Sequence, residues 1–540
     1  MILFTCMNKI SAFLNAEITN KKKLLLNVAI CTFALGLLAH ALGFMNITPS
    51  HDYLNEFYAG DSFLWKVQLG RFVAPLVGIV LGQFVVSPWL SGMVSILLIS
   101  VAAYFTIKIF SLKKRWEIFL LSGIFVTNAT VICLISSFTH DLVVNSLALV
   151  FSVLAVYEWS QILTKFNVKR FLGGIVFVLF TLGLYQSYLS VTLVMISFLV
   201  IEMLLKKQKL KPILKNALIG ILMIGIAGLG YLGISRAACG IAGTDLKSGS
   251  YNSLTNAFEA PKSKKQRLFS TYGYVGWVLF SPTNSWEMVK SHLDEPTLYN
   301  STLYAKSLIN IIIAVISLGL LIKLMIDSKA GVVNKLLVVV IIALLPLMAN
   351  ISHFLSGMSH TLMCYAVWLY YLAFILLIRN SQLSKRLSKL IPSLAIGMMA
   401  ILILFNIEHA NTAYVKKDLL AKSTLSTMTR VLSRIEEQDG YEEGKTPVLF
   451  IQKSKGISAQ KGTSGTESID YLVGLDYNSS ISYKHTIKAY FSNVLQYNLL
   501  FQDDKEVIKR IYENEALKDM HAFPDKSCIQ TIDGTIVVVL

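Results

Sequence analysis

Charged residues are scarce in this sequence. They make up 15% of its 540 residues, whereas a soluble globular chain has roughly 25%. Hydrophobic residues make up 54%, and the mean hydropathy is +0.59. This composition excludes an ordinary soluble domain as the main part of the chain and indicates that lipid surrounds most of it.

Cysteine motifs and repeats are also lacking. The six cysteines show no CxxC or other metal-ligand spacing, which argues against a zinc module or a redox motif. Cys239 and Cys528 both fall in segments predicted to lie outside the membrane, so the pattern leaves a disulfide between them open. No internal repeat and no low-complexity tract is visible.

The formal net charge is +17, and the basic residues are not spread evenly. They cluster in short linkers between apolar runs, as the positive-inside rule predicts for cytoplasmic loops. No soluble basic module is visible, so we expect no nucleic-acid partner. The N-terminus, residues 1–23, ends in Lys21, Lys22 and Lys23 and is predicted to be an uncleaved cytoplasmic segment.

A membrane-spanning helix needs about 20 mostly apolar residues. On that criterion, with loop charge as the guide to orientation, the sequence predicts an α-helical polytopic membrane protein with about eleven transmembrane helices. The predicted spans are 24–44, 89–110, 117–137, 142–159, 171–184, 191–205, 217–234, 308–325, 336–349, 361–377 and 391–405.

One apolar stretch, residues 72–110, is ambiguous by length. Lys108, Lys113, Lys114 and Arg115 mark a cytoplasmic loop, and an odd number of crossings must separate that loop from the first outer one. We therefore interpret residues 73–88 as re-entrant or interfacial and 89–110 as the span. The transmembrane domain then covers residues 24–405, with outer loops at 46–71 and 235–306.

The last part of the chain, residues 406–540, differs in composition. It contains charged helical sequence around 415–438 and short β-like runs at 447–451 and 535–540, the second preceded by Asp533-Gly534. These features predict a small extracytoplasmic α/β domain.

Polar residues collect on the predicted outer face. Ionisable groups near a span end are costly unless they face a cavity or a partner, so this collection suggests a cleft at the membrane boundary. Its members are His51, Asp52, Asp61, Arg71, His140, Asp141, Tyr185, Gln186, Lys264, Lys265, Arg267, His353 and His360.

Structural explanations compete with this one for individual residues. Asp52 could be a solvated loop residue, and Asp141 could cap a helix N-terminus. Tyr185 and Gln186 could bond neighbouring helices. The basic residues from Lys264 to Arg267 could be solvated or could hold lipid phosphates in general.

Three short motifs lie on this face in order. They are Ser50-His51-Asp52-Tyr53 through Gly70-Arg71-Phe72, then Phe138-Thr139-His140-Asp141, then Gly183-Leu184-Tyr185-Gln186-Ser187-Tyr188. Over roughly residues 25–380 the chain resembles the bacterial serotype-converting glucosyl transferase type II family. The resemblance implies a GT-C-like membrane glycosyltransferase in the bacterial inner or plasma membrane.

The implied reaction moves a hexose, with glucose as the expected sugar, from undecaprenyl phosphate to a cell-surface glycan such as an O-antigen or a teichoic acid. Asp52 is our candidate base for the acceptor hydroxyl, with Asp61 or Glu56 as alternatives. Asp141 would be a second acid that orients the acceptor or holds a metal. No cofactor is certain, and a divalent metal is left open.

The remaining roles follow from charge and hydrogen bonding. Arg71, and behind it Lys264, Lys265 and Arg267, would bind the donor phosphate. The expected sugar and acceptor contacts are His51, Asp61, His140, Tyr185, Gln186, His353 and His360. The competing interpretation is a transporter or flippase of lipid-linked sugars, which would favour repeated halves and sites at mid-membrane.

Overall fold

The structure is a computed structural model that describes residues 13–46, 48, 50, 54, 59–80, 87–206, 209–247, 263–280, 301–381, 387–452, 481 and 484–540. At 59–62, 301–303, 388–389 and 484–485 the description covers the backbone alone. The predicted site residues His51 and Asp52 and the side chain of Asp61 lie outside the described part.

The described residues are mainly helical. Among these residues nine helices are long and apolar enough to cross a membrane, and a shorter apolar segment covers Tyr365–Asn380. Ten helices of the bundle are α2 (Lys21–Met45), α6 (Pro88–Ile109), α7 (Arg115–Thr127), α8 (Ala129–Ser137), α9 (Leu142–Ile162), α10 (Val168–Leu184), α11 (Leu189–Leu205), α12 (Leu210–Ile241), α15 (Ser301–Asp327) and α16 (Val332–Ala349).

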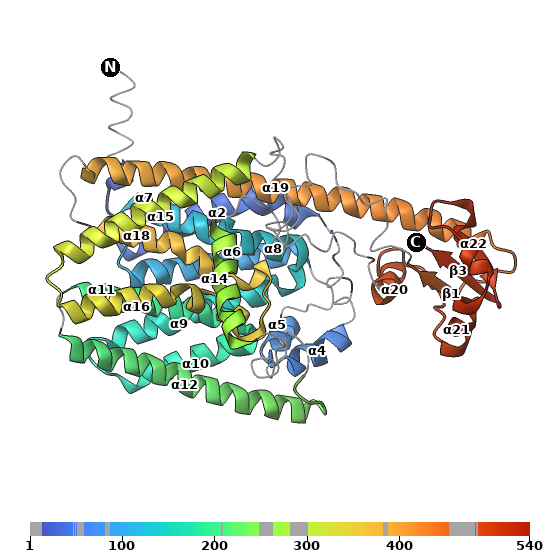
Figure 1. The fold of residues 1–540 in the computed structure, drawn as a ribbon, viewed down its shortest axis with the longest axis horizontal. Helices are drawn as coiled ribbons and strands as arrows, with labels where there is room; N and C mark the ends of the chain where they lie inside the picture. The colour runs from blue at the N-terminus through green and yellow to red at the C-terminus, as the bar shows by residue number, and fades with distance from the viewer. Residues whose placement is uncertain are drawn as a thin grey trace, which may run out of the picture.

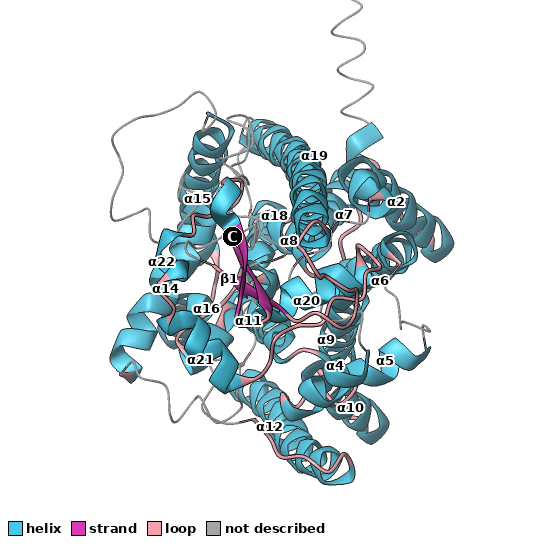
Figure 2. Ribbon diagram, turned by 90° about the vertical axis from the view of Figure 1, so that its right-hand side faces the viewer, coloured by secondary structure: helices cyan, strands magenta, loops and turns pink. Residues whose placement is uncertain are grey.

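Two further helices of the described bundle are α18 (Tyr370–Asn380) and α19 (Leu387–Glu436). Each of the eleven predicted spans coincides with a helix or with a run of helical turns, and the fold class is confirmed. The bundle helices lie roughly side by side, with α19 along one edge and α12 along the opposite edge (Figure 1). The C-terminal domain lies beyond one end of the bundle, and Figure 2 views the molecule from that end.

The predicted span 117–137 is not one continuous helix, because it breaks at Asn128 between α7 and α8. The Asn128 Oδ1 accepts from the backbone N–H groups of Thr130 and Val131, and its Nδ2 donates to the carbonyls of Ile124 and Phe125. A break inside a membrane bundle requires such internal partners, because no water is present to supply them.

The predicted span 361–377 is also irregular in its first half. It begins with two 3-10 turns, η5 (Thr361–Met363) and η6 (Tyr365–Leu369), and becomes α-helical only at α18. This stretch packs on the α7–α8 break: the Tyr365 hydroxyl donates to the Phe125 carbonyl at 2.7 Å, and the Thr130 hydroxyl donates to the Thr361 carbonyl at 2.8 Å. Two irregular segments therefore satisfy each other's backbone groups.

Two predicted non-spanning segments contain short helices. Residues 73–88 include α5 (Ala74–Val80), whose seven residues are too few to cross a bilayer. The expected loop 235–306 contains α14 (Lys264–Phe280), which packs against α15, α16 and α17 (Ile351–Ser356). That segment is therefore partly built into the bundle rather than being a loop throughout. Before α5, α4 (Ala59–Gln68) lies at the end of the bundle that faces the C-terminal domain (Figure 1).

The predicted boundary at residue 405 falls inside α19, a continuous helix of 50 residues. Its second half belongs to the C-terminal domain, because Met428, Val431 and Ile435 are fully buried in that domain's core. The other elements in the described part of the domain are β1 (Val448–Ile451), α20 (Lys484–Asn493), α21 (Lys505–Glu513), α22 (Ala516–Asp519), η8 (Lys526–Cys528), β2 (Ile529–Ile532) and β3 (Thr535–Val539).

The three strands form a mixed sheet in the order β1-β3-β2, with β1 parallel and β2 antiparallel to β3. Asp533 and Gly534 join β2 to β3, and both have positive φ, as a two-residue hairpin turn requires. The sheet is buried on both faces. Val448 and Val538 face the core shared with α19, whereas Leu449 and Val537 face a second cluster. Cys239 and Cys528 are both free thiols, so no disulfide joins them.

The first predicted outer loop touches both parts of the molecule. The Ser50 hydroxyl donates to the Ser137 carbonyl at the end of α8, at 2.5 Å. Leu54 is fully buried in the core of the C-terminal domain, and its carbonyl accepts a hydrogen bond of 3.3 Å from Asn493 Nδ2. Ser50 and Leu54 therefore connect this loop to the bundle and to the domain respectively.

Candidate active site

The candidate site lies where α4, η1 (Thr139–Asp141) and η2 (Gln186–Tyr188) meet. The loop after α4 leaves that helix through a left-handed glycine. Gly70 has φ +74°, the Gly70 N–H donates to the Val67 carbonyl, and the Arg71 N–H donates to the Lys66 carbonyl. This pair of bonds is the Schellman helix end, which only glycine forms without strain. It holds Arg71 at a defined position relative to Lys66.

Asp141 is the buried acid of the site. Lys66 Nζ lies 2.9 Å from Asp141 Oδ1, and His140 Nε2 lies 3.7 Å from Asp141 Oδ2. The side chains of Lys66 and Asp141 are each only 11% exposed. Asn145 Nδ2 donates to the Asp141 carbonyl at 2.8 Å, which fixes the backbone at the start of α9. The carboxylate is thus held by a lysine and accompanied by an imidazole.

Arg71 stacks on Tyr185. The guanidinium carbon lies 4.2 Å from the centre of the Tyr185 ring, a cation–π contact. Its Nε is buried and makes no hydrogen bond to any side chain or backbone group in the described part of the chain. The charges of Arg71 and Lys66 both act on Asp141, so among the described side chains of the site two cations accompany one carboxylate. This excess of positive charge suits an anionic ligand.

Gln186 holds the loop against the bundle. Its Nε2 donates to the Leu69 carbonyl at 2.7 Å and to the Tyr231 hydroxyl at 2.8 Å. The Val73 N–H donates to the Gly183 carbonyl at 2.9 Å, and a Cβ on Gly183 would come within 2.8 Å of the Phe72 ring. Both amide hydrogens of Gln186 therefore already have protein partners.

A second group of predicted residues lies on α14 and α17. His353 bridges two serines, with Nε2 at 3.1 Å from Ser270 Oγ and Nδ1 at 3.1 Å from Ser359 Oγ. Arg267 Nη1 donates to the Leu355 carbonyl. The Tyr274 ring lies next to the His353 ring, with ring centres 5.1 Å apart and the planes tilted by 32°.

The predicted residues thus fall into two groups. Arg71, His140, Asp141, Tyr185 and Gln186 come together around Lys66, whereas Arg267 and His353 form a neighbouring group, linked to the first by contact between α17 and η2. Lys264 and Lys265 are exposed at the start of α14. His360 precedes η5, where its carbonyl accepts from the Met363 N–H.

Lys66 is the residue to which sequence reasoning gave no role. The sequence could have indicated it, because a helix that ends at Leu69-Gly70 places residues 66 and 71 side by side. Within the described part of the chain, no three His, Cys, Asp or Glu side chains form a group that could hold a metal ion.

Comparison with known proteins gives one family. The model of the family described as Glucosyl transferase GtrII matches residues 41–378, which is more than half of the chain. No curated protein and no solved structure shows a significant match. The matched region begins within α2, contains all three site-forming elements, and ends near the C-terminus of α18. This multi-pass membrane protein belongs to the glucosyl transferase GtrII family.

Proposed function

We propose that the chain transfers glucose from a polyprenyl-phosphate donor to a cell-surface glycan, at the membrane face where α4, η1 and η2 meet. Family membership supports glucosyl transfer. The donor, the acceptor and the side of the membrane are part of the proposal. In it the protein resides in a bacterial plasma or inner membrane, the N-terminus is cytoplasmic and the C-terminal domain is extracytoplasmic.

The observation that carries the proposal is the buried Lys66–Asp141 pair with the half-buried Arg71 beside it. It lies at an end of the bundle, where a lipid-linked sugar would present its phosphate. The bond from sugar to phosphate breaks during transfer, and charge accumulates on the departing phosphate oxygens. Fixed cations that lie close to those oxygens lower the barrier because their attraction grows as the charge develops.

In the proposed reaction the acceptor hydroxyl attacks the anomeric carbon and loses its proton to a carboxylate. Asp52 is the proposed base. Asp141 is the less suitable base because Lys66 holds it as a charged, hydrogen-bonded partner. We assign Asp141 to the orientation of Lys66 and of the acceptor, and Arg71 to the donor phosphate, where its planar guanidinium suits two oxygens at once.

The test uses the purified full-length protein in liposomes with a synthetic polyprenyl-phosphate glucose donor and polymer from a host that lacks the protein. We expect glucose transfer by the wild type. In Asp52→Asn the transfer rate should fall by at least about 100-fold, because a general base typically contributes a factor of this size. Asp327→Asn is the control, because it makes the same change of side chain at a partly exposed position of α15, where Asp327 pairs with Lys323 at 2.8 Å.

Two outcomes would count against the proposal. If the liposomes move the donor across the bilayer without forming a glucosylated product, the protein is a transporter of lipid-linked sugars. If transfer proceeds equally well in wild type and Asp52→Asn, the first-loop acid is not the base. Repeating the wild-type assay in excess chelator decides metal dependence, because an exchangeable catalytic cation would be removed.

A further inference from the structure

Two adjoining cavities lie at the end of the bundle opposite to the Lys66–Asp141 pair. The first, of about 380 Å³, lies between α11, α15, α16 and α18. The second, of about 450 Å³, lies next to it and shares Glu202, Lys206 and Asn380 with it. Since α11 begins at η2 and has 17 residues, Glu202 lies roughly 20 Å along the helix from the candidate active site.

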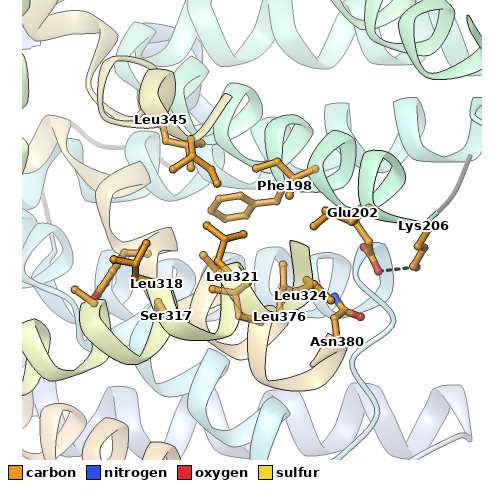
Figure 3. A pocket seen from close by; sticks show the side chains of 17 residues that line it. Phe198, Glu202, Lys206, Ser317, Leu318, Leu321, Leu324, Leu345, Leu376 and Asn380 are labelled. Carbon is orange, nitrogen blue, oxygen red and sulfur yellow. Dashed lines mark hydrogen bonds and ion pairs between the residues drawn. The ribbon is translucent and has the colours of Figure 1, made fainter. Parts of the chain in front are cut away.

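The first cavity is apolar along most of its length. Phe198, Leu321, Leu345 and Leu376 point into it (Figure 3). Leu318, which also lines it, is 59% exposed on the outer surface of the bundle. The cavity therefore reaches the surface that faces the hydrocarbon core of the bilayer. Water has no favourable partners in such a space, whereas a hydrocarbon chain fills it readily. Its volume is within the range of about 300–1,000 Å³ typical of ligand sites.

Polar groups gather at one end of this cavity, where Glu202, Lys206 and Asn380 lie together (Figure 3). Glu202 is already neutralised, because Lys206 Nζ lies 2.7 Å and Arg379 Nη2 lies 3.1 Å from its Oε1. Arg379 also donates from Nη1 to the Phe110 carbonyl. The acidic group that would repel an anion is thus held by two cations.

The second cavity adds more positive charge. Its cations are Lys113, Lys114, Lys206 and Arg379, and its carboxylates are Glu17, Glu117 and Glu202. Glu117 Oε2 accepts from the backbone N–H groups of Lys113 and Lys114 at 2.8 and 2.9 Å. Backbone donors thus hold this carboxylate, and four cationic side chains line the cavity against three carboxylates.

We propose that the two cavities together bind one anionic glycerophospholipid, with an acyl chain in the apolar cavity and the phosphate in the basic one. The arrangement matches the two ends of such a molecule, an apolar chain beside a charged headgroup. The bound lipid would fill the space between α11, α15 and α18 and stabilise their packing. This site is separate from the candidate active site, and the inference does not depend on the proposed function.

The test is the melting temperature of the purified full-length protein in neutral detergent, with added phosphatidylglycerol or phosphatidylcholine of the same chain length. We expect phosphatidylglycerol to raise the melting temperature more than phosphatidylcholine does. In Lys113→Gln/Lys114→Gln the phosphatidylglycerol concentration for half the effect should rise by roughly 25-fold, about fivefold for each lysine near a lipid phosphate.

Matched controls exist for both halves of the site. Lys209→Gln/Lys211→Gln removes two exposed lysines at the start of α12 that line neither cavity, and it should keep the full response. Ala373→Phe should abolish the response by filling the apolar cavity, whereas Ala343→Phe, at an exposed position of α16, should not. Size-exclusion profiles and helical content check that each variant is folded.

Three results would overturn the proposal. One is an equal response to the two lipids, which would show that lipid stabilises the protein without regard to its headgroup. Another is an unchanged response in folded Lys113→Gln/Lys114→Gln. The third is a response to polyprenyl phosphate but none to phosphatidylglycerol, which would assign the cavities to a different phosphate-bearing lipid.

Discussion

Lys66 Nζ and Asp141 Oδ1 form a buried ion pair of 2.9 Å between two segments that are 75 positions apart in the sequence. Such a pair gains little over an apolar pair of the same size, but removing one partner leaves an uncompensated charge. The contribution of the pair to protein stability can therefore be separated from its contribution to function by mutation.

We expect Lys66→Met and Asp141→Asn each to destabilise the folded protein, by about 3–5 kcal/mol for a fully broken buried pair. The double variant Lys66→Met/Asp141→Asn should regain most of the stability and still lack glucose transfer. Thermal unfolding and the liposome assay measure the two effects. Full activity in the double variant would show that the pair is only structural. The exposed pair Lys323–Asp327 is the control, since its loss should cost at most about 1 kcal/mol.

Gly70→Ala tests the helix end that positions Arg71. An alanine at φ +74° is strained by about 1–2 kcal/mol, and relief of that strain would shift Arg71 away from Tyr185. We expect transfer to fall more than protein level does. Gly78→Ala on α5 is the comparison, because a Cβ there meets no atom within 4 Å and Gly78 is helical. Equal activity of the two variants would mean that the turn does not control the site.

Arg71→Lys keeps the charge but loses the planar group that stacks on Tyr185 and presents several donors. We expect weaker donor binding, by roughly 5- to 30-fold for the loss of about 1–2 kcal/mol. The expected signature is a higher KM for the lipid donor and a smaller change in KM for the acceptor. A change confined to the acceptor would instead place Arg71 at the glycan.

Leu54→Ala tests the attachment of the first loop to the C-terminal domain. Removing a fully buried leucine typically costs about 2–5 kcal/mol. We expect faster hydrogen exchange in α20 and reduced transfer, with the membrane bundle still folded. Leu500→Ala in the same domain is the control, because Leu500 is 42% exposed. Unchanged exchange in α20 would show that Leu54 does not hold the two parts together.

Much of the fold could be predicted because hydropathy and loop charge are local properties of the sequence. The predicted spans and the strands β1 and β3, with the Asp533-Gly534 turn, needed no long-range information. The interruptions at Asn128 and at Thr361–Met363 could not be predicted in this way. Their residues are as apolar on average as a continuous span, and the partners that permit the breaks come from distant segments.

The candidate site was partly predictable for a related reason. The alternation of predicted inner and outer loops places Arg71, Asp141 and Tyr185 on one face of the membrane, and the structure brings these three residues together. The loop alternation does not reveal that Lys66 pairs with Asp141, or that His353 bonds Ser270, because those contacts depend on how the helices pack. The roles of Asp52 and of the other site residues remain predictions that the variants above can test.

The continuity of α19 makes the position of the C-terminal domain depend on residue number. Its 50 residues extend about 75 Å, whereas the hydrocarbon layer is about 30 Å thick. Each inserted residue would turn the domain by about 100° and raise it by about 1.5 Å. An insertion of one or two residues in the part of α19 beyond the bilayer would therefore rotate the core of the C-terminal domain that binds Leu54 away from the first outer loop. An insertion of seven residues would restore the angle to within about 20° but would move the C-terminal domain along the helix axis by about 10 Å. The length of α19 thus sets both the angle and the height of the C-terminal domain. Related chains that keep the Leu54 contact should therefore differ little in the length of α19.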